Sequence, residues 1–308
     1  MKSNEILVVF ALVLIGAMMF IAVLLAIYAV YVLATPRECV GLISVDGEIS
    51  TKSQSGGLFG TPTIGSEDIV KQIEDAESRS DVKAVVFEVN SPGGSVVASK
   101  EIYEAVRSMK KPKVAYFREV AASGGYYISA PADYIVSEPD ALTGSIGVIA
   151  TFEDMSSLFS KLGVNYTIMK SGELKDMGSP SRPMTEKERE IMQVIINDIF
   201  GEFRRVVEEG RGDRLNKTKF EEILDARVLT GRQAKDVGLV DELGDKKEAI
   251  RVAAQFGNVK FTQEPDVCDM RSSNLIGDIF SSLGYGITYT VRELVGVNNV
   301  RQVGVSYT

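Results

Sequence analysis

The chain has 308 residues, 45% of them hydrophobic, and a formal net charge of −8 at pH 7. The apolar content suffices for a packed core, whereas the acidic balance excludes a general nucleic-acid surface, because phosphate binding requires clustered Lys and Arg. The chain contains no histidine, which excludes a Ser-His-Asp or Cys-His catalytic unit and a histidine-ligated catalytic metal.

An uncharged, almost wholly apolar stretch runs from Ile6 to Ala34. It is longer than the roughly 20 residues that a helix needs to cross a bilayer, and it predicts a retained transmembrane anchor. A cleaved signal peptide with Val32-Leu33-Ala34 as its cleavage site is the alternative, but a secretory apolar region usually has only about 7 to 15 residues. The flanking basic residues hardly favour either orientation, and the short head before the stretch favours a catalytic body outside the cytoplasm.

Beyond this stretch, short apolar runs alternate with segments of helical periodicity. In chain order, the pattern predicts a strand over 39–49, a polar loop over 50–66, a helix over 67–77, a strand over 84–89, a helix around 98–109, a strand over 114–117, a helix over 123–130, and strands over 134–136 and 146–149. A helix over 155–162, a strand over 164–169 and a polar loop over 171–183 follow. Such alternation predicts an α/β fold with parallel strands joined by crossover helices.

A long helix is predicted from Thr185 to about Glu209, because Thr185 and Glu188 have the spacing of a capping box. Its apolar stripe is typical of a core or subunit contact rather than of a ligand site, and it consists of Ile191, Val194, Ile195, Ile199, Phe203 and Val206. Farther along, Thr230-Gly231 precedes a short helix, and Gly238-Leu239-Val240-Asp241 forms a turn into a strand.

The two cysteines, Cys39 and Cys268, are far apart in the sequence. They lack the spacing of a structural zinc site, and the alternatives of one disulfide or two unpaired thiols stay open. No metal or cofactor is predicted. From Ser272 to Thr308 the periodicity fades, which is typical of a docking tail or a loose amphipathic helix.

Ser123 is the first candidate for catalysis. It lies in Ala121-Ala122-Ser123-Gly124-Gly125, where a strand-like stretch gives way to a helix. Small neighbouring side chains leave its hydroxyl uncovered, and the helix N-terminus directs unpaired N–H groups and a partial positive charge toward it. This setting suits an alkoxide or an oxyanion, although a tight glycine packing contact would produce the same pattern.

A second glycine turn, Pro92-Gly93-Gly94, ends another predicted strand. If the two strands are neighbours, the turns face each other, and the amides of Gly93 and Gly124 are the predicted oxyanion hole, a feature commonly worth about 100- to 1000-fold in rate. Without histidine, the base for the serine must be Lys, Asp or Glu, and a lysine serves only as a neutral amine. Lys175 is one candidate, which these residues alone do not select.

Five sequence blocks occur together in a fixed order. They are Asn90-Ser91-Pro92-Gly93-Gly94-Ser95, Ala122-Ser123-Gly124-Gly125-Tyr126-Tyr127, Leu142-Thr143-Gly144-Ser145-Ile146-Gly147, Ser171-Gly172 with Lys175-Asp176, and Thr230-Gly231 with Gly238-Leu239-Val240-Asp241. In order and spacing, these blocks resemble the signal peptide peptidase A family, Ser-Lys serine proteases of the ClpP/crotonase-like fold. The resemblance extends from about Val45 to Gly244, and the combination is highly specific although each block alone is modest.

The resemblance implies a role for each matching residue. Ser123 would attack the scissile carbonyl, and Lys175 would take its proton and return it to the leaving amine. Ser145 would hydrogen-bond the Lys175 amine, and Gly93 and Gly124 would donate the oxyanion amides. No cofactor or metal takes part, and a neutral lysine base implies an alkaline activity optimum.

The resemblance also implies a domain plan: an N-terminal anchor over 1–38, a ClpP/crotonase-like protease domain over 39–265 and a C-terminal tail over 266–308. The expected substrates are hydrophobic peptides, such as cleaved signal peptides in a cell membrane crossed once by this chain. Shorter family members form ring- or dome-shaped homo-oligomers whose active sites are shared between neighbours. The lysine that meets Ser123 therefore belongs to the same chain or to the next one.

Three alternatives keep the same fold. A stomatin-associated membrane Ser-Lys protease is disfavoured by the Lys-Asp block together with the downstream Thr-Gly and Gly-Leu-Val-Asp segments. A crotonase-like acyl-CoA enzyme needs neither a membrane span nor this serine. An inactive membrane scaffold is the non-enzymatic alternative, and the competent residue type at every proposed catalytic position disfavours it.

Overall fold

The structure is a computed structural model that describes residues 14–26, 37–54 and 62–271. The chain divides into two compact units, Met1–Asp269 and Met270–Thr308. Of the tail predicted over 266–308, residues 272–308 lie outside the described residues, and Val267–Asp269 form a strand. Residues 14–26, within the predicted anchor, are helical. Among the residues that the structure describes, no helix combines the length and the apolar character that a membrane crossing requires. The rest of the predicted span lies outside the described residues, and the anchor stays a prediction.

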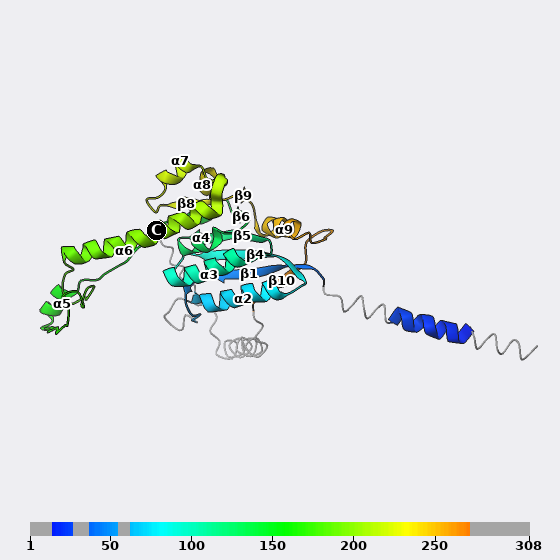
Figure 1. The fold of residues 1–308 in the computed structure, drawn as a ribbon, viewed down its shortest axis with the longest axis horizontal. Helices are drawn as coiled ribbons and strands as arrows, with labels where there is room; N and C mark the ends of the chain where they lie inside the picture. The colour runs from blue at the N-terminus through cyan, green and yellow to red at the C-terminus, as the bar shows by residue number, and fades with distance from the viewer. Residues whose placement is uncertain (1–13, 27–36, 55–61, 272–308) are drawn as a thin grey trace, which may run out of the picture. The chain divides into compact units, whose positions relative to one another are not determined.

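An eight-stranded sheet forms the centre of the first unit (Figure 1). Its strands are β1 (Cys39–Asp46), β4 (Val82–Ser91), β5 (Lys113–Ala122), β6 (Tyr134–Ser137), β7 (Leu142–Gly144), β8 (Val228–Thr230), β9 (Glu242–Leu243) and β10 (Val267–Asp269). The order β10-β1-β4-β5-β6-β9 is parallel throughout, and β7 pairs with the end of β5. Only β7 and β8 pair antiparallel within this sheet. The α/β prediction is therefore confirmed, with a mixed rather than wholly parallel sheet.

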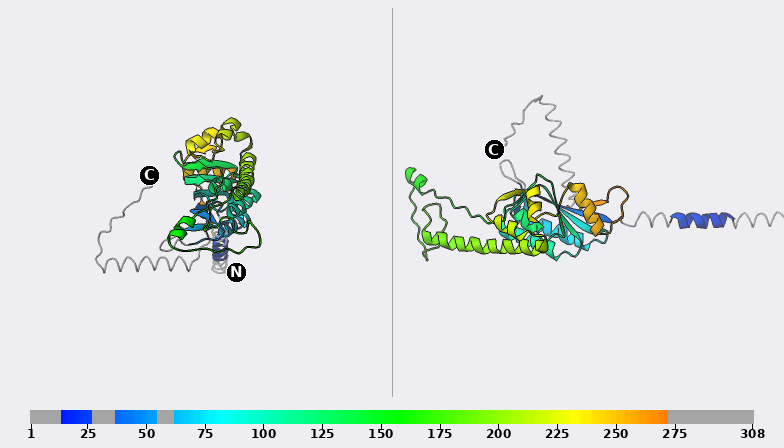
Figure 2. Two further views of the ribbon diagram at one scale, coloured as in Figure 1. Left: turned by 90° about the vertical axis from the view of Figure 1, so that its left-hand side faces the viewer. Right: turned by 90° about the horizontal axis from the view of Figure 1, so that it is seen from above.

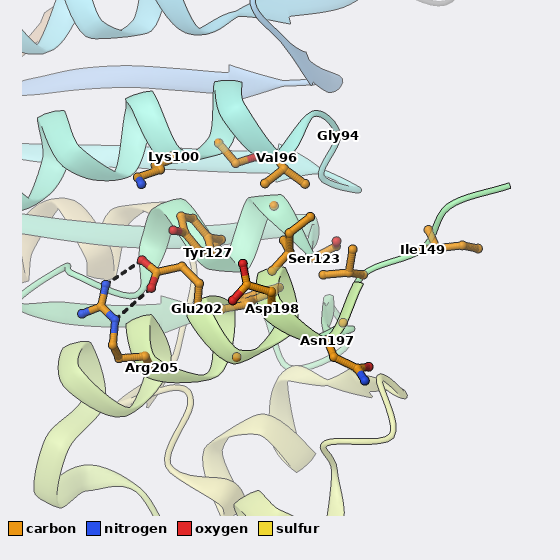
Figure 3. Close-up of a pocket in the computed structure, with 17 residues that line it drawn as sticks. Gly94, Val96, Lys100, Ser123, Tyr127, Ile149, Asn197, Asp198, Glu202 and Arg205 are labelled. Carbon is orange, nitrogen blue, oxygen red and sulfur yellow. Dashed lines mark hydrogen bonds and ion pairs between the residues drawn. The ribbon is translucent and has the colours of Figure 1, made fainter. Parts of the chain in front are cut away.

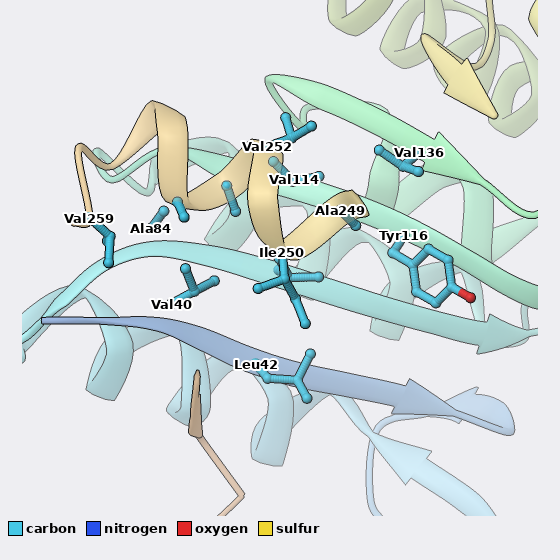
Figure 4. Close-up of a cluster of buried hydrophobic side chains, with 13 residues drawn as sticks. Val40, Leu42, Ala84, Val114, Tyr116, Val136, Ala249, Ile250, Val252 and Val259 are labelled. Atoms are coloured by element: carbon cyan, nitrogen blue, oxygen red, sulfur yellow. The ribbon is translucent and has the colours of Figure 1, made fainter. Parts of the chain in front are cut away.

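Helices cover both faces of the sheet. The described helices that follow residue 37 are α2 (Ser66–Ser78), α3 (Val96–Ser108), α4 (Gly124–Ser129), α5 (Ser156–Lys161), α6 (Glu186–Arg211), the 3₁₀ turn η1 (Gly212–Arg214), α7 (Lys217–Glu222), α8 (Gly231–Val237) and α9 (Lys246–Phe256). A short second sheet pairs β2 (Glu48–Ser50) with β3 (Thr63–Gly65). On one face, α9 packs Ala249, Ile250 and Ala253 onto a buried apolar cluster that includes Val86 and Val114 (Figure 4). Because strand side chains alternate, the opposite face receives α2, α3 and α4.

A disulfide joins Cys39 on β1 to Cys268 on the edge strand β10. The two strands run parallel, and Gly41 pairs with Cys268 in the register. The disulfide settles the question that the sequence left open, and it ties the end of the first unit to its first strand. A carboxylate oxygen of Asp81 lies within 4.8 Å of both sulfurs, but these sulfurs are bonded to each other.

Two predicted strands are wrong. Residues 146–149 and 164–169 have no strand structure, and Ile149 and Met169 are 87% and 96% exposed. Short apolar runs do not by themselves distinguish a buried strand from an exposed apolar segment. In this chain they lie beside α5 and α6 rather than in the sheet.

Candidate active site

Ser123 lies at a sharp turn between β5 and α4. It is the N-cap residue of α4 and has φ 52° and ψ −121°, a backbone conformation that costs a non-glycine residue about 1 to 3 kcal/mol. The Ser123 N–H donates to the Gly144 carbonyl over 2.9 Å, which holds the turn against β7. Ser123 is half-buried and follows the carboxyl end of the inner strand β5, and a strained strand-to-helix turn of this kind can present a serine hydroxyl as a nucleophile.

The two glycine turns lie against each other, as the sequence predicted. A Cβ added at Gly93 would lie 2.6 Å from the Gly124 nitrogen and 2.9 Å from the Ser123 Cβ, so no other residue fits there. Gly93 has φ +104°, which also favours glycine. The register explains the contact, because Ser91 at the end of β4 pairs with Ala121 on β5.

The amides at this junction differ in their hydrogen bonds. The Gly93 N–H donates to the Ser91 Oγ over 3.1 Å. Among the described residues, the N–H groups of Gly124 and Gly94 have no acceptor, and both glycines line the cavity beside Ser123. Gly94 is therefore a further oxyanion candidate that the sequence reasoning missed. The Gly-Gly pair was the available signal, but it does not say which amide faces the cavity.

Ser145 is held next to the Ser123 turn by backbone pairing. It directly follows Gly144, whose carbonyl accepts the Ser123 N–H, and its own N–H donates to the Arg227 carbonyl over 3.0 Å. The buried Thr143 hydroxyl donates to the Ala121 carbonyl over 2.7 Å. The Leu-Thr-Gly-Ser block thus fixes β7 to the end of β5, and the structure brings Ser145, Ser123, Gly124 and Gly93 together.

A cavity of about 660 Å³ opens beside Ser123 (Figure 3). Its lining includes Val96, Ser99 and Lys100 from α3, Ser123, Gly124 and Tyr127 around α4, Gly147 to Ile149, and residues of α6 between Asn197 and Arg205. The walls therefore combine apolar and aromatic surface with a few charged side chains, which is typical of a binding site for an extended ligand.

The charged side chains of the cavity are partly paired. Arg205 donates two hydrogen bonds to the Glu202 carboxylate, and this pairing lowers the Glu202 pKa. Burial raises the pKa of Tyr127 to about 12, so its phenol is neutral at physiological pH. No charge other than those of Lys100, Asp198, Glu202 and Arg205 lines the cavity in the described structure.

Lys175 is not part of this cavity. Its side chain is exposed on the loop that precedes α6, and the next residue, Asp176, is bound to Arg182 near the first turn of α6. The cavity, by contrast, uses α6 from Asn197 to Arg205. From Glu188 to Asn197, the first of these residues, the helix advances about 14 Å at roughly 1.5 Å per residue. Figures 1 and 2 show α5 near the N-terminal end of α6, away from β5 and α4.

Comparisons with known proteins identify a family of peptidases. Residues 105–260 match the model of peptidase family S49, and residues 63–137 match the model of Clp protease. A protein of Methanocaldococcus jannaschii named "Putative protease" is 38% identical over 245 residues, which cover 79% of this chain and 78% of that protein.

Two longer proteins are also similar. Protease 4 of Salmonella typhi is 35% identical over 268 residues, which cover 83% of this chain and 42% of that protein. The chloroplastic serine protease SPPA of Arabidopsis thaliana is 30% identical over 267 residues, covering 85% of this chain and 39% of that protein. The chain thus spans less than half the length of these two relatives.

Proposed function

Because the chain belongs to peptidase family S49, the signal peptide peptidase A family, and is a peptidase, we propose that it is a serine endopeptidase with Ser123 as nucleophile and Lys175 as general base. The observation that carries the proposal is the Ser123 turn. Its strained backbone, the free Gly124 amide and the adjoining cavity supply a nucleophile, an oxyanion donor and a place for substrate.

The proposed reaction has two steps. The Ser123 Oγ forms a bond to the scissile carbonyl carbon while its proton moves to the neutral Lys175 amine, and the amides of Gly124 and of Gly93 or Gly94 stabilise the oxyanion. The carbon–nitrogen bond then breaks, and the lysine ammonium protonates the leaving amine. Water, deprotonated by the same lysine, hydrolyses the acyl ester and restores Ser123. Ser145 orients the lysine amine.

The base is supplied by a second copy of the chain. The position of Lys175 near the N-terminal end of α6 supports this part of the proposal, because the cavity beside Ser123 uses the middle and later turns of the same helix, from Asn197 to Arg205. A heterologous contact between copies, repeated around a ring, would bring the lysine loop of one subunit to the serine of the next.

An exposed apolar surface around α5 and α6 supports the oligomer. It consists of Leu158, Leu162, Val164, Tyr166, Ile168, Met169, Val194 and Ile195, all at least 41% exposed. Apolar groups in such number on one segment are typical of a protein contact. The first half of the predicted α6 stripe is thus left for a partner, whereas Phe203 and Val206 in its second half are buried.

Hydrophobic peptides, such as cleaved signal peptides, are the proposed substrates, and the membrane is the proposed location. The uncharged stretch from Ile6 to Ala34 supports an anchor. The disulfide between Cys39 and Cys268 supports a catalytic body outside the cytoplasm, since disulfides persist mainly in oxidising compartments. A protease added to intact spheroplasts should then digest the catalytic body of the chain. If the catalytic body resists the added protease until the cells are lysed, it lies on the cytoplasmic side.

Cleavage of a fluorogenic hydrophobic peptide tests the catalytic assignment. Wild type is compared with Ser123→Ala and Lys175→Ala, and each variant is checked for fold and oligomeric state. Loss of turnover in both folded variants is the expected result. Retained turnover in either variant would refute the catalytic role of the substituted residue. The inactive scaffold would be favoured if wild type neither cleaves the peptide nor is labelled by an acylating serine reagent.

A further inference from the structure

Arg182 connects the loop that carries Lys175 to α6 through two carboxylates. The Arg182 guanidinium donates to both carboxylate oxygens of Asp176, over 2.9 and 2.8 Å, and to both carboxylate oxygens of Glu188, over 2.9 and 2.6 Å. Asp176 directly follows Lys175 in the chain, and Glu188 is in the first turn of α6. Arg182 thus connects the residue next to the proposed base with the rigid start of a long helix.

Both carboxylates are fixed from their other sides. Glu188 is fully buried, and it accepts the Thr185 N–H over 2.8 Å as part of the capping box. Asp176 also accepts a hydrogen bond from the Lys170 amine over 2.6 Å, and its side chain is only 10% exposed. The group differs from an ordinary surface ion pair, whose side chains are mobile and solvated. We call Asp176, Arg182 and Glu188 the carboxylate clamp.

The mechanism proposed above assigns no task to this clamp. A base must lie within hydrogen-bond reach of the proton that it takes, and a displacement of about 1 Å can cost about 100-fold in rate. Lys175 projects from an exposed loop, so its backbone needs support from elsewhere. Besides the Lys175 N–H bond to the Gly172 carbonyl and other short-range turns within the loop, two sets of side-chain contacts join the loop to α6. One is an exposed ion pair between Lys187 and Glu173 over 2.9 Å, and the other is the largely buried clamp.

We propose that Arg182 is a positioning residue for the general base, which it fixes through Asp176 and Glu188. The inference rests on the proposed role of Lys175. The planar guanidinium has five donors and binds two carboxylates in parallel, a geometry that the single ammonium of lysine does not reproduce. Arg182 pairing lowers the pKa of Asp176 and, to about 2, that of Glu188, so both carboxylates stay ionised wherever a neutral lysine base works.

The test compares Arg182→Ala and Arg182→Lys in the full-length protein, with Arg204→Ala as the matched control. Arg204 is on α6 and, like Arg182, contacts two carboxylates, those of Glu208 and Glu221, but it is remote from the lysine loop. Peptide cleavage is measured as kcat and KM per folded oligomer, with the folded fraction taken from size-exclusion chromatography. Asp176→Asn is a second variant, in case Arg182→Ala does not fold.

A positioning role predicts a kcat about 100-fold lower in Arg182→Ala, an unchanged KM, partial recovery in Arg182→Lys and no effect of Arg204→Ala. Asp176→Asn should lower kcat in the same direction. The inference is overturned if kcat per folded oligomer is unchanged, or if the loss follows only the unfolded fraction. Lys175→Ala separates the two proposals: its retained activity would refute the base, whereas an inactive Lys175→Ala beside a fully active Arg182→Ala would refute the clamp alone.

Discussion

The Ser123 turn leaves little room for side chains on the residues around it. A Cβ added at Gly124 would lie 2.5 Å from the Ser99 Oγ and 3.2 Å from the Gly93 Cα. The Ser99 hydroxyl is buried and has no hydrogen-bond partner among the described residues. Its removal therefore frees space beneath Gly124 without breaking a hydrogen bond.

We predict that Gly124→Ala lowers kcat/KM about 100-fold, because the new methyl group displaces the oxyanion amide from Ser123. Ser99→Ala alone should leave activity and stability nearly unchanged, since an unpaired buried hydroxyl contributes little. The double variant Gly124→Ala with Ser99→Ala should recover part of the loss. Peptide kinetics of the three variants provide the measurement, and a double variant as inactive as Gly124→Ala would exclude the steric explanation.

Sequence reasoning reached the site residues that belong to local motifs. Ser123 and the two glycine turns were recognisable because small residues at a strand-to-helix junction have a local meaning. Ser99 and the free Gly94 amide were not, because their significance depends on which surfaces meet after folding. Lys175 was identified by resemblance, and its distance along α6 from the cavity is a tertiary property that no local pattern encodes.

Among the elements, α6 is fixed at its C-terminal end by a buried ion pair. Arg211 is 1% exposed and donates two hydrogen bonds to the Asp241 carboxylate and one to the Gly238 carbonyl. Asp241 also accepts the Ile135 N–H of β6 over 2.8 Å. The Gly-Leu-Val-Asp block therefore attaches α6 to the sheet and has a structural rather than a chemical role.

We predict that Arg211→Met lowers the free energy of unfolding by about 3 to 5 kcal/mol, because it leaves the largely buried Asp241 carboxylate without its main partner. Arg204→Met on the exposed face of the same helix should cost at most about 1 kcal/mol. Guanidinium titrations of the detergent-solubilised variants measure both changes. Equal midpoints for the two variants would show that the buried pair does not hold α6.

The carboxylate clamp gives the N-terminal end of α6 a defined dependence on pH. The hydrogen bonds from Arg182, followed by the Thr185 N–H, lower the Glu188 pKa to about 2, below the ordinary value of about 4.3. A lowered carboxyl pKa stabilises the folded state fully above the ordinary value, and the contribution declines as the pH falls toward about 2. The stability difference between wild type and Glu188→Gln should therefore be constant above about pH 5 and vanish near pH 2. A difference that persists at pH 2 or grows there would contradict the ionised clamp.

The predicted elements were most accurate where one helix or strand carries its own signals. The capping box of α6 is present with both of its hydrogen bonds, and Gly238 ends α8 in the left-handed conformation, where a Cβ would lie 2.0 Å from the Arg214 carbonyl oxygen. The antiparallel pairing of β7 with β8 was not predictable, since it joins segments far apart in the chain. The apolar runs over 146–149 and 164–169 were mistaken for strands because a short apolar run does not by itself distinguish a strand from another apolar segment.

At the scale of the whole molecule, the proposed base Lys175 lies near the N-terminal end of α6, whereas the cavity beside Ser123 uses Asn197 to Arg205 of that helix. This separation is the basis for the proposal that two copies of the chain complete one dyad. If neighbouring copies complete each other, two inactive variants complement when they share an oligomer. Ser123→Ala supplies the lysine, and Lys175→Ala supplies the serine. Random co-assembly of equal amounts should restore roughly one quarter of wild-type activity, the fraction of interfaces that receive one competent residue from each side.

Co-expression with two affinity tags, sequential purification and peptide cleavage provide the measurement. Because a dyad within one chain would leave every mixed oligomer inactive, the absence of recovery in verified hetero-oligomers would place Lys175 and Ser123 in the same subunit.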